Sequence, residues 1–142
     1  MATFWHGKVS YFGLGTSGTP ATVVDLSSYI NDLKLTRPID TAETSTFGST
    51  YKSYIQGLAD NSLSISGRWD ATLDAQLNNL VGFDNSGTGI SYTYGPSGST
   101  ATRVKYTGFT FLTSYDLSGS ISDVVAFSVN LQNIGAPTRG TF

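Results

Sequence analysis

The stretch from Leu58 to Gly82 constrains the fold most, because its hydrophobic period changes once along its length. Over residues 62–69 apolar and polar side chains alternate, which is the period of a half-buried β-strand. After Asp70 the apolar side chains recur at helical spacing, as Leu73, Leu77, Leu80 and Val81. The sequence therefore predicts a strand that runs directly into an α-helix at about residues 71–81.

The predicted helix carries a signal at each end. Asp70 is a candidate N-cap, because its carboxylate can accept the free backbone N–H groups of the first turn. Gly82 is a candidate stop, because glycine takes the left-handed conformation that often follows a helix. No other segment has a convincing helical period, so we expect the helix to cover one open edge or face of a sheet.

Further strands are predicted where apolar and polar side chains alternate, namely at residues 8–12, 32–37, 90–94, 103–115 and 125–131. Residues 13–20, 83–89 and 95–98 have the composition of loops and turns, and residues 133–142 are expected to form an extended tail. Asp25 is a candidate cap for a single helical turn that buries Leu26, Tyr29 and Ile30.

The strand at residues 103–115 is unusual because it is apolar on both faces. Phe109 and Phe111 lie on one face, and Tyr106 and Leu112 lie on the other. Such a strand is expected to be covered on both sides, by a second sheet and by either the helix or a neighbouring molecule. Gly108 is a candidate β-bulge within it.

These elements define the predicted fold. About seven or eight strands and one helix indicate a mainly β protein, an antiparallel β-sandwich or partly closed barrel flanked by one α-helix. Its 142 residues suit a single domain covering residues 1–142.

The segment from Asp40 to Tyr54 fits neither period. Seven of its fifteen residues are serine or threonine, and Phe47 is its one large apolar side chain. A loop of this length is uncommon in a compact domain, and it cannot bury enough surface to be ordered alone. We expect an interaction arm that becomes ordered against another subunit; the alternative is a long exposed hairpin whose ends are β-strands.

Composition restricts the function. Charged residues make up 13% of the chain, about half the usual share, and the net charge is −2. Such a surface favours dense packing against other protein, and the lack of a basic stripe argues against specific nucleic-acid binding. The chain has no cysteine, and no apolar run is long enough to span a membrane. No secretion signal opens the chain, so we expect synthesis and retention in a cytoplasm.

No catalytic or metal-binding pattern stands out. His6 is the single histidine and is interpreted as a surface or packing residue. Asp40 with Glu43, and Asp70 with Asp74, are the close carboxylate pairs, and Asp70 and Asp74 are better explained by capping and the helix dipole. We therefore expect no enzyme activity, no metal and no cofactor. The aromatic residues could form a sugar-binding platform, although most fall at core spacing.

Three segments carry a resemblance to a known family. They are residues 25–32 (DLSSYIND), residues 40–60 (DTAETSTFGSTYKSYIQGLAD) and residues 64–70 (SISGRWD). Together with residues 108–116 and 125–132, they resemble the tail tube (major tail) proteins of long-tailed bacteriophages. The resemblance covers most of the chain.

The resemblance implies a β-sandwich flanked by one helix, with six copies to a ring and rings stacked into a virion tail tube. One sheet of each subunit would join a continuous barrel around a channel that DNA crosses without specific binding. Tape measure and tail terminator proteins are the other implied partners. The loop at about residues 40–54 would reach a neighbouring subunit or the next ring, through Thr41, Glu43, Thr44, Phe47, Tyr51, Lys52 and Tyr54.

Two other functions stay open at this point. A capsid decoration or head-stabilising virion protein can carry a similar pattern of strands. A carbohydrate-binding β-module would account for the aromatic residues.

Overall fold

The computed structural model describes residues 3–15, 23–83 and 87–142. In these residues the chain forms nine strands, one α-helix and one short 3₁₀ helix. In chain order the elements are η1 (Gly7–Val9), β1 (Tyr11–Gly15), β2 (Val23–Asp25), β3 (Ile30–Thr36), β4 (Ile39–Glu43), β5 (Tyr54–Ala59), β6 (Ser62–Arg68), α1 (Ala71–Asn78), β7 (Ile90–Gly95), β8 (Val104–Ser120) and β9 (Asp123–Thr141).

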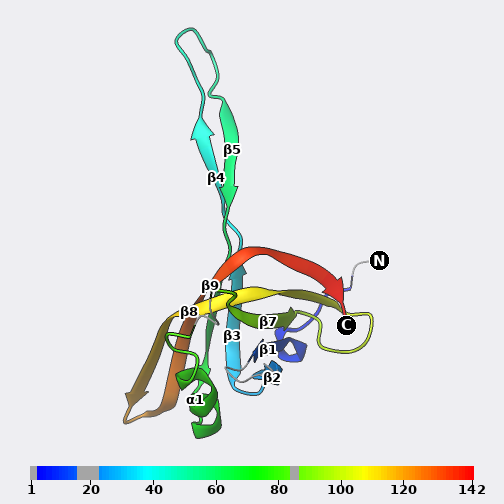
Figure 1. Cartoon of the computed structure of the whole chain (residues 1–142), viewed down its shortest axis with the longest axis vertical. Coiled ribbons are helices and arrows are strands. Elements are labelled where there is room, and N and C mark those ends of the chain that lie inside the picture. Colours follow the sequence, from blue (N-terminus) through cyan, green and yellow to red (C-terminus); the bar gives the residue numbers. More distant parts are fainter. Residues whose placement is uncertain (1–2, 16–22, 84–86) are drawn as a thin grey trace.

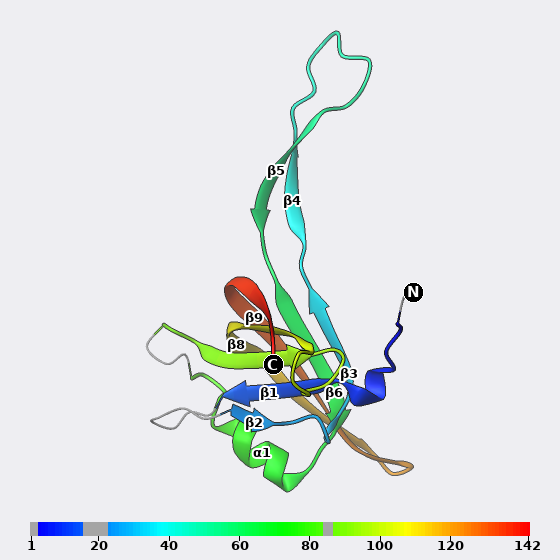
Figure 2. The same cartoon turned by 90° about the vertical axis from the view of Figure 1, so that its right-hand side faces the viewer.

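Seven of the strands form one antiparallel sheet in the order β2-β1-β7-β8-β9-β6-β3. The two outermost strands, β2 and β3, are consecutive in the chain and are joined by residues 26–29 alone. Because so short a connection links the two edges, the sheet must curl back on itself, as Figures 1 and 2 show. The prediction of a partly closed barrel is confirmed, with one curled sheet supplying both walls.

The core lies inside the curl, and α1 closes one end of it (Figure 2). Asp70 caps the helix as predicted, accepting a 2.9 Å hydrogen bond from the Thr72 amide. Leu73 and Leu77 are buried. The core side chains come from α1, from the turn that follows it and from both walls: Phe12, Leu14, Leu26, Leu63, Ile65, Leu73, Leu77, Leu80, Ile90, Tyr92, Phe127, Val129 and Leu131.

The helix is shorter than predicted. It ends at Asn78, and the chain then turns, with Leu80 N–H donating to the Leu77 carbonyl oxygen. Leu80 is still buried in this turn, whereas Val81 is 55% exposed and does not belong to the apolar stripe. Gly82 adopts a φ of +76°, in the left-handed region predicted for it.

The first strand differs from its prediction. Residues 7–9 form η1, and the strand begins at Tyr11 and continues to Gly15, into the predicted loop. No local pattern indicates this strand, because Gly13 and Gly15 look like loop residues, yet Leu14 between them is buried. The rest of that predicted loop, residues 16–20, lies outside the described residues, as do residues 84–86 of the predicted turn at 83–89.

The predicted helical turn after Asp25 is a tight turn that begins at a strand end. The Asp25 carboxylate accepts a 2.9 Å hydrogen bond from the Ser27 amide, and Tyr29 N–H donates to the Leu26 carbonyl oxygen. Leu26 is buried and Tyr29 packs against the core, as expected. This turn carries the chain from one edge of the curled sheet to the other.

The C-terminal strands are longer than predicted. β8 and β9 pair along almost their whole lengths, so the expected tail is the second half of β9. The register shifts between Thr107 and Phe109, which confirms the bulge at Gly108. A side chain there would meet the Tyr92 ring at 3.1 Å, which explains the glycine. Phe109 is 44% exposed, so a single chain does not supply the cover predicted for both faces of β8.

Strands β4 and β5 form a separate two-stranded sheet. We call residues 39–59 the arm and the seven-stranded sheet with α1 the body. The arm projects away from the body as an extended hairpin in both views (Figures 1 and 2).

Candidate subunit interface

The arm has no core of its own. From residue 37 to residue 60 every side chain is exposed except Ser45, which is half-buried. β4 and β5 pair only with each other among the described strands. The tip is held by local hydrogen bonds, including 2.7 Å from the Thr44 amide to the Ser53 carbonyl oxygen and 2.8 Å from the Ser53 amide to Ser45 Oγ. A hairpin with exposed apolar side chains and no packing partner is typical of an interaction surface.

The structure places all seven predicted contact residues on the arm, and all seven are exposed. Thr41, Glu43 and Tyr54 share one face, because Glu43 pairs with Tyr54 and Thr41 pairs with Gln56. The other four, Thr44, Phe47, Tyr51 and Lys52, lie in the loop between the strands, where the Phe47 ring is fully exposed. The segment is thus a hairpin with β ends, and the contact role of these residues stays a prediction.

Sequence reasoning missed three exposed apolar residues of the arm, Ile39, Ile55 and Leu58. The signal was present, because residues 54–59 read Tyr-Ile-Gln-Gly-Leu-Ala and have the β-branched and aromatic content of a strand. They extend the candidate surface from the tip of the arm to its base.

Two free strand edges bound the strands β8-β9-β6-β3 of the body. β3 is the last strand of the sheet and pairs with β6 on one side only. β8 pairs with β7 only through residues 106–110, so residues 111–120 pair with β9 alone. In the part of the chain that the structure describes, no strand occupies either edge. Unpaired edges of this kind are templates for pairing with another chain.

The two free edges are complementary in direction. Between them lie β9 and β6, and each neighbouring pair in the order β8-β9-β6-β3 is antiparallel. β3 therefore runs opposite to β8. If β3 of one copy lay beside residues 111–120 of the next, the joined sheet would stay antiparallel throughout.

The outward face of these four strands is covered mainly by small polar side chains. Inward residues such as Leu63, Ile65 and Val129 belong to the core, so the residues between them face outward. The outward residues of β6 and β9 and their pairing partners on β8 are mostly serine and amide side chains: Ser62, Ser64, Ser66, Ser114, Ser118, Ser128, Asn130 and Gln132. Asp32, Lys34, Arg68 and Asp116 add two charges of each sign.

The body carries a further apolar projection at the end opposite to the arm. It is the tip of the β8–β9 hairpin, where Leu117, Ile121, Val124 and Val125 are exposed (Figure 1). In Figure 1 the arm lies at the top of the long axis, and the hairpin tip lies low and to one side, near the level of α1.

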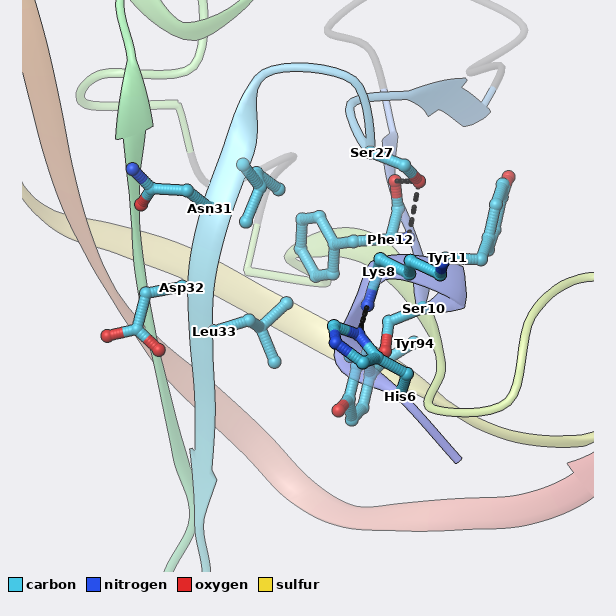
Figure 3. Close-up of a pocket in the computed structure, with 12 residues that line it drawn as sticks. His6, Lys8, Ser10, Tyr11, Phe12, Ser27, Asn31, Asp32, Leu33 and Tyr94 are labelled. Atoms are coloured by element: carbon cyan, nitrogen blue, oxygen red, sulfur yellow. Dashed lines mark hydrogen bonds between the residues drawn. The ribbon is translucent and has the colours of Figure 1, made fainter. Parts of the chain in front are cut away.

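A hollow of about 600 Å³ lies between η1 and the start of β3 (Figure 3). Its polar side chains mostly serve the local backbone. His6 Nδ1 accepts a 3.1 Å hydrogen bond from the Lys8 amide at the start of η1, and Ser27 Oγ accepts one of 2.9 Å from the Phe12 amide. Since Ile30 and Leu33 of β3 line it, the hollow lies beside one of the free edges.

Asp74 is the acidic residue most involved in packing. Its carboxylate accepts hydrogen bonds from Tyr115 Oη at 3.0 Å and from Trp69 Nε1 at 3.4 Å, which ties α1 to β8. Burial raises the pKa of Tyr115 to about 12, with the hydrogen bond to Asp74 and its charge adding to the effect. Asp74 thus has a structural role in addition to its place in the first turn of α1.

Residues 3–15, 23–83 and 87–142 hold no group of three or more histidine or acidic side chains that could bind a metal ion. No helix among them has the length and apolar character needed to cross a membrane.

Solved structures match the fold over nearly the whole chain. The tail of an empty GTA particle, refined with C6 symmetry, superposes with a TM-score of 0.73 at 16% identity, covering 95% of this chain and 98% of that one. The SPP1 tail tube gives a TM-score of 0.72 at 16% identity, covering 98% and 80%. The six-fold symmetrised baseplate of the anti-feeding prophage gives 0.70 at 9% identity, covering 98% and 97%.

The chain has the fold of these tail and tube structures. No family profile and no curated protein sequence matches it. The likeness therefore rests on the path of the backbone, and it includes the arm, because the matches cover at least 95% of the chain.

Proposed function

We propose that this protein is a tail tube subunit of a bacteriophage-like particle, which assembles into hexameric rings that stack into a DNA-conducting tube. The observation that carries the proposal is the pair of free, oppositely directed edges on β3 and on residues 111–120 of β8. Pairing one edge with the other in the next copy is a heterologous contact. Such a contact closes into a ring when the rotation between copies divides a full turn.

The ring would form a continuous antiparallel barrel, which removes every free edge of these strands. Its symmetry is taken from the matching structures, of which one was refined with C6 symmetry and one was six-fold symmetrised.

The channel would be lined by the outward face of β3, β6, β9 and β8. The opposite face carries the core and α1, so it cannot face an open channel. Serine and amide side chains with balanced charges suit a wall that DNA passes, because a basic wall would bind phosphates strongly and in a salt-dependent way. We expect no enzymatic role for this subunit.

The arm would link subunits beyond the strand edges, within a ring or from one ring to the next. The arm projects from one end of the molecule and the hairpin tip lies towards the other, as contacts along a stack require (Figure 1). Tape measure and tail terminator proteins are the proposed further partners, in the virion tail.

Disulfide trapping tests the ring directly, because the chain has no cysteine of its own. Lys34 on β3 and Asp116 on β8 both face outward, on the two free edges. Lys34→Cys combined with Ser114→Cys, Asp116→Cys or Ser118→Cys samples the possible registers. Oxidation of assembled protein should give a ladder of covalent oligomers that ends at the ring size.

Each single-cysteine variant is the matched control and should give no species beyond a dimer. Negative-stain microscopy of the same samples should show rings or tubes. A protein that stays monomeric at high concentration, or binds empty capsid shells instead, would overturn the proposal. Tubes without a ladder in any of the three registers would exclude the edge pairing.

A further inference from the structure

The arm is continuous with the body through one long two-stranded ribbon. β3 leads into β4 and β5 leads into β6, and the last paired residues on either side of the junction are Thr36 with Ser62 and Ile39 with Ala59. We call residues 37–38 and 60–61 the joint. Pro38 has no backbone N–H and cannot donate to a ladder, so the ribbon is weakened at this point.

Side chains hold one strand of the joint to β9. The Asn61 side-chain Nδ2 donates to the Gly135 carbonyl oxygen at 2.8 Å, and Asn61 Oδ1 accepts a hydrogen bond from the Asn133 side-chain Nδ2. Asn133 also donates to Tyr92 Oη at 3.2 Å. Outside this cluster, Gln132 Nε2 donates to the Asp60 carboxylate at 2.7 Å and to the Asn61 carbonyl oxygen at 3.2 Å.

The cluster is buried although it is polar. Asn61 and Asn133 are each 6% exposed. Asn133 continues the inward series of Phe127, Val129 and Leu131 on β9, where an apolar side chain would complete the core. Its Oδ1 atom is buried without a hydrogen-bond partner in the described part of the chain, which costs stability. The hydrogen bonds of this buried pair are satisfied in one arrangement of Asn61 and Asn133, so the pair restricts the geometry of the joint.

Two backbone hydrogen bonds also support the joint, and one of them runs from the Asn133 amide to the Asn61 carbonyl oxygen at 3.2 Å, next to the last β6–β9 pair. Across the ribbon itself the Asp60 amide donates to the Pro38 carbonyl oxygen at 2.9 Å. A hollow of about 370 Å³ opens beside it, between the joint and residues 133–137 of β9. Only one backbone hydrogen bond joins this part of the ribbon to β9, so the side-chain contacts around it carry much of the hold on the direction of the arm.

We infer that Asn61 and Asn133 are positioning residues that fix the direction of the arm relative to the body before assembly. This inference rests on the proposed tube function for its biological purpose, because an arm that already points correctly loses less conformational entropy when it reaches a neighbour. The orientation itself is a property of the single chain and can be measured without assembly.

The test uses spin labels on the otherwise cysteine-free chain, one at Gln56→Cys on the arm and one at Ser118→Cys on the body. Pulsed electron–electron distance measurements on the labelled protein, diluted into unlabelled protein, give the distribution of the separation between the labels. The parent should give one narrow distribution. Asn61→Ala with Asn133→Leu should broaden it about twofold or more, because the side-chain clamp is lost while the strands remain.

Two controls separate positioning from folding. Asn130→Ala removes another amide hydrogen bond from β9, to Ser114 Oγ at 2.9 Å, and should leave the distribution unchanged. Gln132→Ala removes the outer contacts to Asp60 and Asn61 without altering a buried residue. It should broaden the distribution less than the double variant does, and it provides the test if the double variant fails to fold. The melting temperature of the double variant should fall, because Tyr92 Oη and the Gly135 carbonyl oxygen lose their donors, so the distances are measured at a temperature at which parent and variants are all folded.

Assembly of the unlabelled double variant should be about tenfold slower than that of the parent. A parent distribution as broad as that of the variants, or double and Gln132→Ala variants as narrow as the parent, would overturn the inference. If the distributions behave as expected but the parent forms no tubes, the proposed function fails while the positioning role stands.

Discussion

Body and arm are both built from antiparallel strands that carry apolar side chains, but only the body buries those side chains. β6 in the body and β5 in the arm are neighbouring strands of similar length, and both carry apolar side chains. β6 buries Leu63 and Ile65 against the far wall of the curled sheet, whereas every residue of β5 is exposed. The body covers its apolar side chains within its own curled sheet, whereas the arm needs another subunit to cover them. Stability and assembly should therefore respond to different residues.

The largest effect is expected in the core of the body. Leu77→Ala should destabilise the fold by about 2–5 kcal/mol, because Leu77 is buried in the core of the body. Leu58→Ala, at an arm residue that is 83% exposed, is the matched control and should change stability by less than about 0.5 kcal/mol. Urea unfolding measures both changes, and equal losses would remove the distinction between body and arm.

A smaller loss is expected at the start of α1. Asp70→Ala removes the cap on the Thr72 amide and should cost about 0.5–2 kcal/mol. Asp70→Asn should restore most of the loss, because asparagine is also a good N-cap. Denaturation midpoints of the three proteins test this, and an asparagine variant as unstable as the alanine variant would show that capping is not the cause.

The body should also lose stability in alkali. The folded pKa of Tyr115, about 12, lies above its ordinary value of 10.0, so the neutral hydroxyl is favoured in the folded state. The resulting stability is fully present below pH 10.0 and is lost as the pH rises towards 12. Tyr115→Phe should reduce this loss when urea midpoints at about pH 9 and about pH 11 are compared. If Tyr115→Phe loses as much stability as the parent between these two pH values, other tyrosines are the cause of the loss.

The smallest effect on folding, with the largest effect on assembly, is expected at the arm tip. Phe47→Ala, or deletion of residues 44–52, should leave the melting temperature of the unassembled protein unchanged, because all side chains of this tip except Ser45 are exposed. The same changes should abolish tube formation. Sedimentation and electron microscopy report the outcome, and normal tubes from the deletion variant would disprove the contact role of the arm.

The sequence predicted the elements whose signals are local. The alternation of β6, the cap at Asp70 and the anomalous segment from Asp40 to Tyr54 all depend on residues within a few positions of one another. The prediction of a glycine-rich loop at Gly13 failed because β1 is a strand only through its pairing with β2 and β7. The predicted C-terminal tail is part of β9 for the same reason, since residues 133–141 form a strand by pairing with β8.

The candidate interface could be predicted only in part. The arm stood out because its composition differs from that of the rest of the chain. The free edges did not, because an edge is defined by which strand is absent, and that depends on the neighbour order of the whole sheet. Asn61 and Asn133 are 72 residues apart, so no local pattern connects them.

Amide hydrogen exchange in β3 and in residues 111–120 of β8, compared between unassembled protein and assembled tubes, tests the central claim most directly. If these strands pair across subunits, the backbone amides on their free edges should exchange quickly before assembly and much more slowly in the tube. Exchange in β6 should change little. Edge amides that exchange equally fast in both states would contradict the account.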